Sequence, residues 1–256
     1  MLLAIDIGNT NIGFGIFQGE RMHTTWSIAT DIHRTADEYA VMFMNLLEQQ
    51  DISVSNVDHV IICNVVPPLE PIFEDVSRRY FKVVPLVVGP GVKTGVRICT
   101  DNPREVGADR VVNAAAAHRL YGGPLIVIDF GTATTVDAVS KDGDYLGGAI
   151  APGVGISAEA LFERASKLPR IELIPPEHAI GRNTVTAMQS GMIYGYVGLI
   201  ESLVSHIRRE LAGDAKVVAT GGFAHVIAKE TTTIDVVDQH LTLIGLRLIH
   251  EMNIPR

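Results

Sequence analysis

Two short segments of the chain combine residue types and spacing that suit phosphate chemistry. Each begins with an aspartate at the end of an apolar run and continues through a glycine into small polar residues, from Asp6 to Asn11 and from Asp129 to Thr135. Glycine lets backbone N–H groups approach an anion closely, and a carboxylate at a strand end can hold Mg²⁺ directly or through water. We therefore expect two phosphate-binding turns, with Asp6 as a ligand for Mg²⁺.

The two segments are copies of one pattern. Residues 5–10 match residues 128–133, and the two aspartates are separated by about half of the 256-residue chain. Turns of the form Asp-x-Gly are common after strands, so a single copy is more often structural, but the second copy favours a functional interpretation. A duplicated half predicts two similar lobes with a cleft between them, into which each lobe directs its aspartate and glycine turn. The sequence contains neither a Walker motif nor a Rossmann glycine motif.

A third glycine turn follows a later apolar run. Thr220, Gly221 and Gly222 stand directly after residues 216–219. A glycine pair at a strand end allows a flat ligand such as a purine to lie against the backbone. The signal is weak by itself because Gly-Gly turns are common.

Strand-like and helix-like periodicity alternate along the chain, which predicts an α/β fold with mixed sheets. The expected strands cover residues 2–7, 11–17, 59–66, 83–88, 125–129, 134–140, 145–150, 216–219 and 233–237. The expected helices cover residues 34–50, 70–81, 106–120, 157–167, 183–211 (one helix or two), 223–229 and 241–252. The apolar face of residues 183–211 suits either core packing or a dimer interface.

Composition narrows the class of protein. Apolar residues make up 47% and charged residues 20% of the chain, which is typical of globular proteins. A net charge of −8 disfavours a broad nucleic-acid surface. Cys63 and Cys99 form no CxxC pair and are expected to be small buried hydrophobes. No apolar run approaches the ~18 residues of a membrane span and no basic segment precedes the apolar start, so we expect a cytoplasmic protein.

The two phosphate turns and the Gly-Gly turn together resemble the actin, Hsp70 and sugar-kinase ATPase superfamily. Further motifs narrow the resemblance: Asp-Asn-Pro-Arg-Glu-Val-Gly-Ala-Asp-Arg at 101–110, Gly-Gly-Ala-Ile-Ala-Pro-Gly at 147–153 and Gly-Arg-Asn-Thr at 181–184. In this order and at this spacing, the chain is similar to type III pantothenate kinases from residue 1 to its last helix.

The resemblance implies a fold, an activity and an assembly. The fold would be two similar ribonuclease-H-like or actin-like ATPase lobes, 1–120 and 121–256, each a mixed sheet flanked by helices, with the active site in the cleft between them. The activity would be phosphorylation of pantothenate by ATP, the first step of coenzyme A biosynthesis. The family uses Mg²⁺ and a monovalent cation, K⁺ or NH₄⁺, and forms homodimers, with no nucleic-acid or membrane partner.

The resemblance also implies roles for individual residues. The base is Asp109, and the ligand of the monovalent cation is Asp129. The implied nucleotide contacts are Asp6, Ile7, Gly8, Asn9, Thr10, Asn11, Ile12, Gly13 and Thr132, and to these we add Gly221 and Gly222 for adenosine. The implied substrate contacts are Thr100 (often a tyrosine in the family), Gly107, Ala108, Asp109, Arg110 and Thr184.

Other interpretations stay open from the residues alone. An aspartate at a helix start is often a capping acid, and Arg110 is as often a surface ion pair as a partner for a substrate carboxylate. The whole chain could be a catalytically silent relative that acts as an accessory transcription factor, or a kinase of the same superfamily with another hydroxylated acceptor. A silent relative is expected to have lost acids from its site. The presence of Asp6, Asp109 and Asp129 therefore favours an enzyme.

Overall fold

The computed structural model describes residues 1–211 and 213–254, and the chain in it divides into two compact units. The first unit comprises residues 1–95, 104–116 and 242–256, and the second comprises residues 96–103 and 117–241. The expected division after residue 120 differs from this in three respects. Residues 96–103 and residues 117–120 group with the second unit, and the C-terminal segment from Thr242 groups with the first.

The first unit is built on a five-stranded sheet in the order β3-β2-β1-β4-β5. Strands β1, β2 and β3 form an antiparallel meander, and β4 and β5 continue the sheet in parallel to β1. The strands are β1 (Leu2–Ile7), β2 (Asn11–Gln18), β3 (Arg21–Ala29), β4 (His59–Asn64) and β5 (Leu86–Val87). The sequence pattern did not predict β3, and β5 is shorter than the expected strand.

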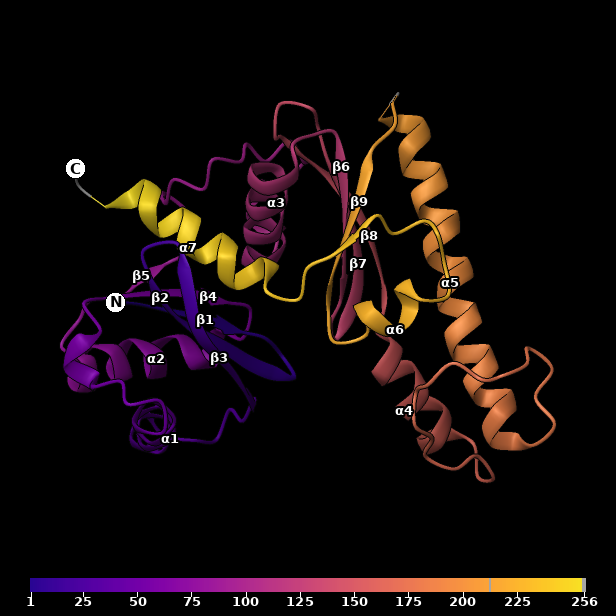
Figure 1. Ribbon diagram of the computed structural model, residues 1–256, viewed down its shortest axis with the longest axis horizontal. Coiled ribbons are helices and arrows are strands. Elements are labelled where there is room, and N and C mark those ends of the chain that lie inside the picture. Colours follow the sequence, from indigo (N-terminus) through magenta and orange to yellow (C-terminus); the bar gives the residue numbers. More distant parts are fainter. Residues whose placement is uncertain (212, 255–256) are drawn as a thin grey trace. The chain divides into compact units, whose positions relative to one another are not determined.

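Helices cover both faces of this sheet. They are α1 (Ala36–Glu48), α2 (Glu70–Val76, continued by a π-helical turn to Phe81), the first part of α3 (Ala108–Tyr121) and α7 (Leu241–Asn253). Figure 1 shows α1 and α2 on one side of the sheet and α7 on the other. Leu3, Ile5 and Ile7 of β1 belong to the buried cluster that includes Phe43 of α1 and Phe73 of α2. Because side chains alternate along a strand, Asp6 lies on the opposite face.

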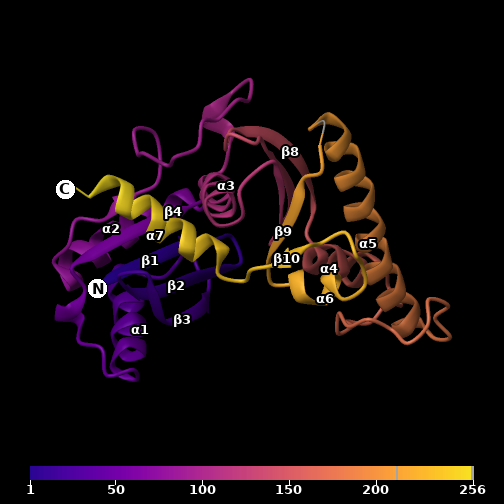
Figure 2. The ribbon, with the colours of Figure 1, turned by 45° about the horizontal axis from the view of Figure 1, so that its top comes forward.

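The last helix completes the first unit. A Cβ atom on Gly15 of β2 would lie 3.2 Å from Leu243 Cδ1 of α7, and one on Gly245 would lie 2.5 Å from the backbone oxygen of Val112 in α3. The close packing of α7 against both β2 and α3 explains why the chain returns to the first unit after Leu241. Figure 2 shows α7 running across the strands of this unit.

The second unit repeats the topology of the first strand for strand. Its sheet has the order β10-β9-β6-β7-β8, with an antiparallel meander β6-β7-β8 and parallel neighbours β9 and β10. The strands are β6 (Leu125–Phe130), β7 (Ala133–Val139), β8 (Tyr145–Pro152), β9 (Lys216–Gly221) and β10 (Val236–Val237). The duplication inferred from the two aspartate motifs is therefore confirmed as a repeated fold.

One face of this second sheet is covered by three helices, α4 (Val154–Arg164), α5 (Thr184–Glu210) and α6 (Ala224–Ala228). Helix α5 is a single helix, begun by Asn183, whose side chain accepts a hydrogen bond from the backbone N–H of Thr186 at 2.9 Å. Its residues Ile193 and Ile200 are buried against Ile126 and Ile128 of β6. Over the described part of the chain, no helix is both long and apolar enough to cross a membrane.

Candidate active site

The first phosphate turn joins β1 to β2, and hydrogen bonds from another segment of the chain help to fix its conformation. The backbone N–H of Gly8 donates to the Asn11 carbonyl at 3.1 Å. Thr30, which directly follows β3, donates from Oγ1 to the Gly8 carbonyl at 2.6 Å and from its N–H to the Thr10 carbonyl at 3.0 Å. Asn9, Thr10 and Asn11 are exposed at the tip. Thr30 was not predicted, because a lone threonine after an unrecognised strand carries no sequence signal.

The other expected nucleotide contacts in this segment differ in what they present. Ile7 and Ile12 are fully buried in the core of the first unit. Only their backbone atoms can face a ligand, so their side chains serve to fix the turn. Gly13 stands opposite Asp6 in the β1–β2 register, and a Cβ atom there would meet nothing within 4 Å. The face of the sheet beside Asp6 is therefore open at this point.

Two carboxylates and a thiol come together in the first unit. Cys63 of β4 is paired with Asp6 in the parallel β1–β4 register. Its thiol donates a hydrogen bond to the Asp6 carboxylate, and the Asp109 carboxylate is close enough to act on it electrostatically. Burial, followed by these two negative charges, raises the pKa of the Cys63 thiol well above its ordinary value. We refer to Asp6, Cys63 and Asp109 as the carboxylate–thiol cluster.

Asp109 is placed by the start of α3. The carbonyl of Gly107 accepts the backbone N–H groups of Arg110 and Val111 at 3.1 and 3.3 Å, so the helix begins at Ala108 and Asp109 falls in its first turn. Asp109 Oδ1 accepts the Arg110 N–H at 2.8 Å. The unsatisfied N–H groups of a first turn favour negative charge. A Cβ atom on Gly107 would lie 2.5 Å from Asp109 Oδ1, so glycine is needed to leave the carboxylate this position.

The second phosphate turn joins β6 to β7 in the second unit. The N–H of Gly131 donates to the Ala133 carbonyl at 3.1 Å, and the N–H of Gly153, after β8, donates to the Thr132 carbonyl at 3.0 Å. The residue that follows the third strand of the meander thus fixes the turn, as Thr30 does in the first unit. Thr134 Oγ1 is buried without a hydrogen-bond partner in the described part of the chain.

The Gly-Gly turn lies directly beside Asp129. Asp129 pairs with Thr220 in the β6–β9 register, and Gly221 follows with φ of +90°. A Cβ atom on Gly221 would lie 2.5 Å from Asp129 Oδ1 and 2.7 Å from the backbone of Phe130, so a larger residue would displace both. Gly222 is exposed, and a Cβ atom there would meet nothing within 4 Å.

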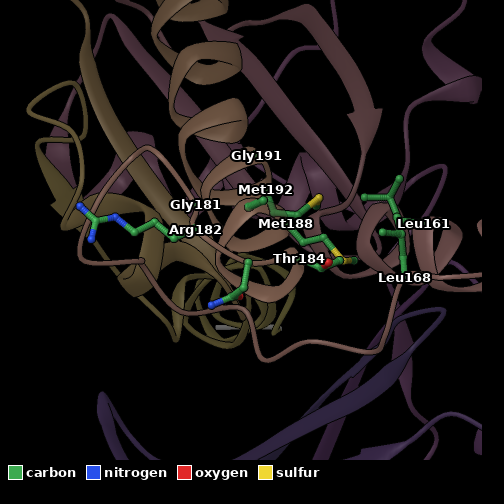
Figure 3. Close-up of a pocket in the computed structure, with 10 residues that line it drawn as sticks. Leu161, Leu168, Gly181, Arg182, Thr184, Met188, Gly191 and Met192 are labelled. Carbon is green, nitrogen blue, oxygen red and sulfur yellow. The ribbon is translucent and has the colours of Figure 1, made fainter.

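Two expected substrate contacts lie elsewhere in the second unit. Thr100 has a buried Oγ1 atom for which the described residues supply no hydrogen-bond partner, and its Cγ2 lies 3.8 Å from the Cβ position of Gly147. Thr184 opens α5 and lines a cavity of 710 Å³ together with Leu161, Leu168, Met188 and Met192. Figure 3 shows the side chain of Arg182, from the same cavity, extending away from the two methionines.

The donor set of the first unit suits Mg²⁺. Nucleotide-bound Mg²⁺ is typically held by one or two protein carboxylates and by phosphate oxygens, rather than by a cage made of protein alone. Asp6, at the end of a strand and beside an exposed turn, is a donor of this kind. Residues 1–211 and 213–254 contain no group of three or more histidine, cysteine, aspartate or glutamate side chains arranged to hold a metal ion.

Comparison with known proteins settles the family. The sequence model of the type III pantothenate kinases matches residues 2–206. The chain belongs to the type III pantothenate kinase family. A type III pantothenate kinase of Dehalococcoides mccartyi is 55% identical over 252 residues, which are 98% of this chain and 96% of the relative. One of Moorella thermoacetica is 51% identical over 253 residues, which are 99% of this chain and 100% of the relative.

Solved structures agree on the fold. A structure named for the Baf family of transcriptional activators, from Campylobacter jejuni, superposes with a TM-score of 0.63 at 20% identity and 98% coverage of both chains. A polyphosphate/ATP-glucomannokinase from Arthrobacter gives a TM-score of 0.52 at 14% identity, covering 98% of this chain and 99% of the other. At such identities the likeness shows the fold alone. The α/β ATPase fold expected for a type III pantothenate kinase is thereby confirmed, as is the family resemblance.

Proposed function

We propose that this chain transfers the γ-phosphoryl group of ATP to the primary hydroxyl of pantothenate, giving 4′-phosphopantothenate and ADP, the first step of coenzyme A biosynthesis. Membership in the type III pantothenate kinase family supports the substrates. The observation that carries the chemistry is the carboxylate–thiol cluster, where Asp6 from a phosphate turn and Asp109 from the start of α3 act on one thiol. It supports the enzyme over a silent relative.

In the proposed reaction, the hydroxyl oxygen of pantothenate attacks the γ-phosphorus in line with the bond to ADP. That bond breaks as the new P–O bond forms, and Asp109 orients the hydroxyl and takes up its proton. Phosphoryl transfer depends mostly on positioning and charge stabilisation, so the rigid first turn of α3 is a suitable support for the base. Gly107 contributes by leaving room for the carboxylate.

The nucleotide would be held by the two turns. The N–H groups and polar side chains of residues 9–11 and Thr132 would donate to its phosphate oxygens, Gly8 would let the backbone approach closely, and Gly221 with the open Gly222 would lie against the adenine. Mg²⁺ on Asp6 supplies charge neutralisation for the phosphates when it is bound. The net charge of −8 opposes the approach of a polyanion. We therefore expect modest ATP affinity, which a sub-micromolar dissociation constant would contradict.

Pantothenate carries a carboxylate, for which Arg110 is the proposed partner because a guanidinium can bind a carboxylate through two hydrogen bonds. Gly107 and Ala108 would contribute through the backbone at the same helix start. Thr100 supports a contact through its buried hydroxyl, which the described residues leave unpaired. The monovalent cation, K⁺ or NH₄⁺, is proposed at Asp129, whose carboxylate lies against Gly221 at the end of β9. A cytoplasmic location accords with the proposed use of ATP.

We also propose a homodimer formed through the second unit. Large apolar side chains are exposed on α4, on the segment that follows it and at the start of α5, among them Ile156, Phe162, Ile180 and Val185. The cavity containing Thr184 belongs to the same region. A second copy of the chain would cover these side chains and would bring Thr184 next to the partner's substrate.

The proposal is tested by following ADP release with MgATP and pantothenate in potassium, ammonium and sodium buffers. Pantothenate-dependent turnover that requires potassium or ammonium is the expected result, and it would support both the acceptor and the cation site. Equal turnover in sodium would contradict the cation site alone. Absence of turnover in all three buffers, from protein that is folded by circular dichroism, would contradict the function and direct attention to other hydroxylated acceptors.

A further inference from the structure

Asp6 has one close neighbour for which the proposed reaction has no use. Cys63 is 0% exposed and lies on the strand next to β1. In a parallel pair, residues in register point to the same face of the sheet, so the thiol and the Asp6 carboxylate share the face opposite the core of α1 and α2. The thiol donates its hydrogen to that carboxylate. A residue so deeply buried is not placed to react with solutes.

The duplicated half supplies an independent parallel. Asp129 is the counterpart of Asp6, and β9 is the counterpart of β4. The residue in register with Asp129 on β9 is Thr220, which is 2% exposed. Each half therefore places a short, buried side chain with a hydrogen to donate directly beside its motif aspartate. A strand interior that required only an apolar filler would have no reason to place a donor at this position twice.

We infer that Cys63 is a positioning residue for Asp6: its S–H group fixes the carboxylate at the end of β1 in the orientation that receives the Mg²⁺–nucleotide. The inference rests on the proposed function of the phosphate turn. The thiol acts through Asp6 and does not touch the substrates. Its ordinary pKa already lies above neutrality, so the donor form is the resting form. A carboxylate held by a neutral donor keeps its charge and its remaining lone pairs for the cation.

A packing role and a positioning role predict different rankings of variants at this position. Serine and alanine have similar small volumes, but only serine retains a donor, and valine fills the space without one. A packing role therefore groups Cys63→Ser with Cys63→Ala and favours Cys63→Val. A positioning role groups Cys63→Ser with the wild type and groups Cys63→Ala with Cys63→Val. Ile61→Val, two residues earlier on the same face of β4, is the matched control for a small loss of buried volume.

The functional readout is the binding of MgADP, measured by calorimetry without any acceptor, together with KM for MgATP and kcat. We expect Cys63→Ala and Cys63→Val to weaken MgADP binding and to raise KM by about tenfold, the usual effect of losing one hydrogen bond to a charged group. Cys63→Ser and Ile61→Val should stay within about threefold of wild type. Equal losses in the serine and alanine variants would overturn the inference.

The hydrogen bond itself has a spectroscopic readout. The S–H stretch falls in an infrared window clear of other protein bands, and the chain has two cysteines. Cys63 is buried as expected, but the expectation was wrong for Cys99, which is exposed and serves as an internal reference. Replacing Asp6 by alanine should move the Cys63 band to higher frequency and leave the Cys99 band in place. An unmoved Cys63 band would overturn the inference. Because neither the infrared nor the binding measurement uses pantothenate, failure of the proposed acceptor would be seen separately in the turnover assay.

Discussion

At the scale of single residues, the proposed role of Asp109 as the base is the one that can be tested most directly. Asp109→Asn keeps the shape and the hydrogen bond from the Arg110 N–H but removes the group that accepts the hydroxyl proton. We expect kcat to fall by roughly 10²–10⁴, the usual contribution of a general base, with little change in thermal stability. Asp142→Asn, on the exposed turn between β7 and β8, is the matched control and should leave kcat unchanged. Near-normal turnover in Asp109→Asn would remove this residue from the role.

Gly107 leads to a second prediction, which concerns the position of the Asp109 carboxylate and not its ability to accept a proton. A methyl group at this residue would meet Asp109 Oδ1 at 2.5 Å, and the carboxylate is the free end of a side chain that can rotate away. Gly107→Ala should therefore leave the melting temperature close to that of wild type while it lowers kcat by about tenfold or more, because a displaced base is out of line with the hydroxyl. The control is Gly198→Ala in α5, where a Cβ atom meets nothing within 4 Å. A large loss of stability in Gly107→Ala with unchanged kcat would contradict the argument.

The sequence predicted some of these residues and not others for a physical reason. Asp6, Asp129 and Asp109 stand in local motifs, where type and spacing are visible along the chain. Thr30 and Cys63 act on the first turn through the pairing of β3 and β4 with distant strands. Such register is decided by tertiary packing, and Cys63 read along the chain is only a small apolar residue in a buried run.

At the scale of elements, the edge strand β3 has a function beyond extending the sheet. It places Thr30 beside the first phosphate turn, where the hydroxyl and the N–H of Thr30 both donate hydrogen bonds to carbonyls of the turn. Thr30→Val keeps the shape and removes the bond to Gly8. Since one neutral hydrogen bond contributes about 0.5–1.5 kcal/mol, we expect KM for ATP to rise roughly threefold to tenfold with little effect on KM for pantothenate. Thr25→Val, on the same strand beside Gly15, should change neither constant.

The elements themselves were largely predictable, and the exceptions follow from exposure. The two aspartate motifs indicated the duplication, and the long helix α5 matched its apolar periodicity within a residue at each end. Strand β3 was missed because none of its residues is fully buried, and because the stripe of partly buried side chains at Met22, Thr24, Trp26 and Ile28, of which Trp26 and Ile28 pack on the core, is interrupted by a threonine. Strands β5 and β10 were predicted to be longer than they are, because an apolar run does not reveal how many of its residues pair with a neighbouring strand.

Helix α7 contains a histidine, His250, that makes the stability of the fold depend on pH. His250 is 7% exposed and packs against the His59 ring at a centroid distance of 4.8 Å. Burial, and then the nearby His59, lower the pKa of His250 from 6.5 to about 4. Between pH 6.5 and 4, His250 therefore binds a proton in the unfolded chain but stays neutral in the folded chain. The stability contributed by neutral His250 is fully present above pH 6.5 and is lost as the pH falls towards 4.

We expect this group to lower the free energy of unfolding by about 2–3 kcal/mol between pH 6.5 and 4. Urea unfolding of wild type and His250→Gln across this range measures the effect. The variant should be less stable at pH 7.5, because glutamine does not reproduce the packing of the buried imidazole. Its free energy of unfolding should nevertheless depend less steeply on pH. His178→Gln, at an exposed histidine, should retain the wild-type slope. Parallel pH profiles for wild type and His250→Gln would contradict the assignment.

At the scale of the whole molecule, the open question is what covers the apolar surface of the second unit. Ile180 is 83% exposed and stands next to Gly181 of the cavity that holds Thr184. An isoleucine this exposed, beside other exposed apolar side chains, is typical of an interaction surface. Because the proposed occupant is a second copy, a charge at Ile180 would be buried in the dimer without a partner, and would weaken association by more than about tenfold.

Sedimentation velocity and ADP release on the same samples test this directly. Wild type should sediment as a dimer, and Ile180→Glu should shift to monomer and lose activity in parallel, since Thr184 would no longer meet the partner's substrate. Val84→Glu is the matched control, because Val84 is a 69% exposed apolar residue of the first unit, and this variant should remain dimeric and active. If Ile180→Glu were monomeric yet fully active, the dimer would have no part in the site. If wild type itself were an active monomer, the homodimer proposal would fall, and the apolar surface would require another partner.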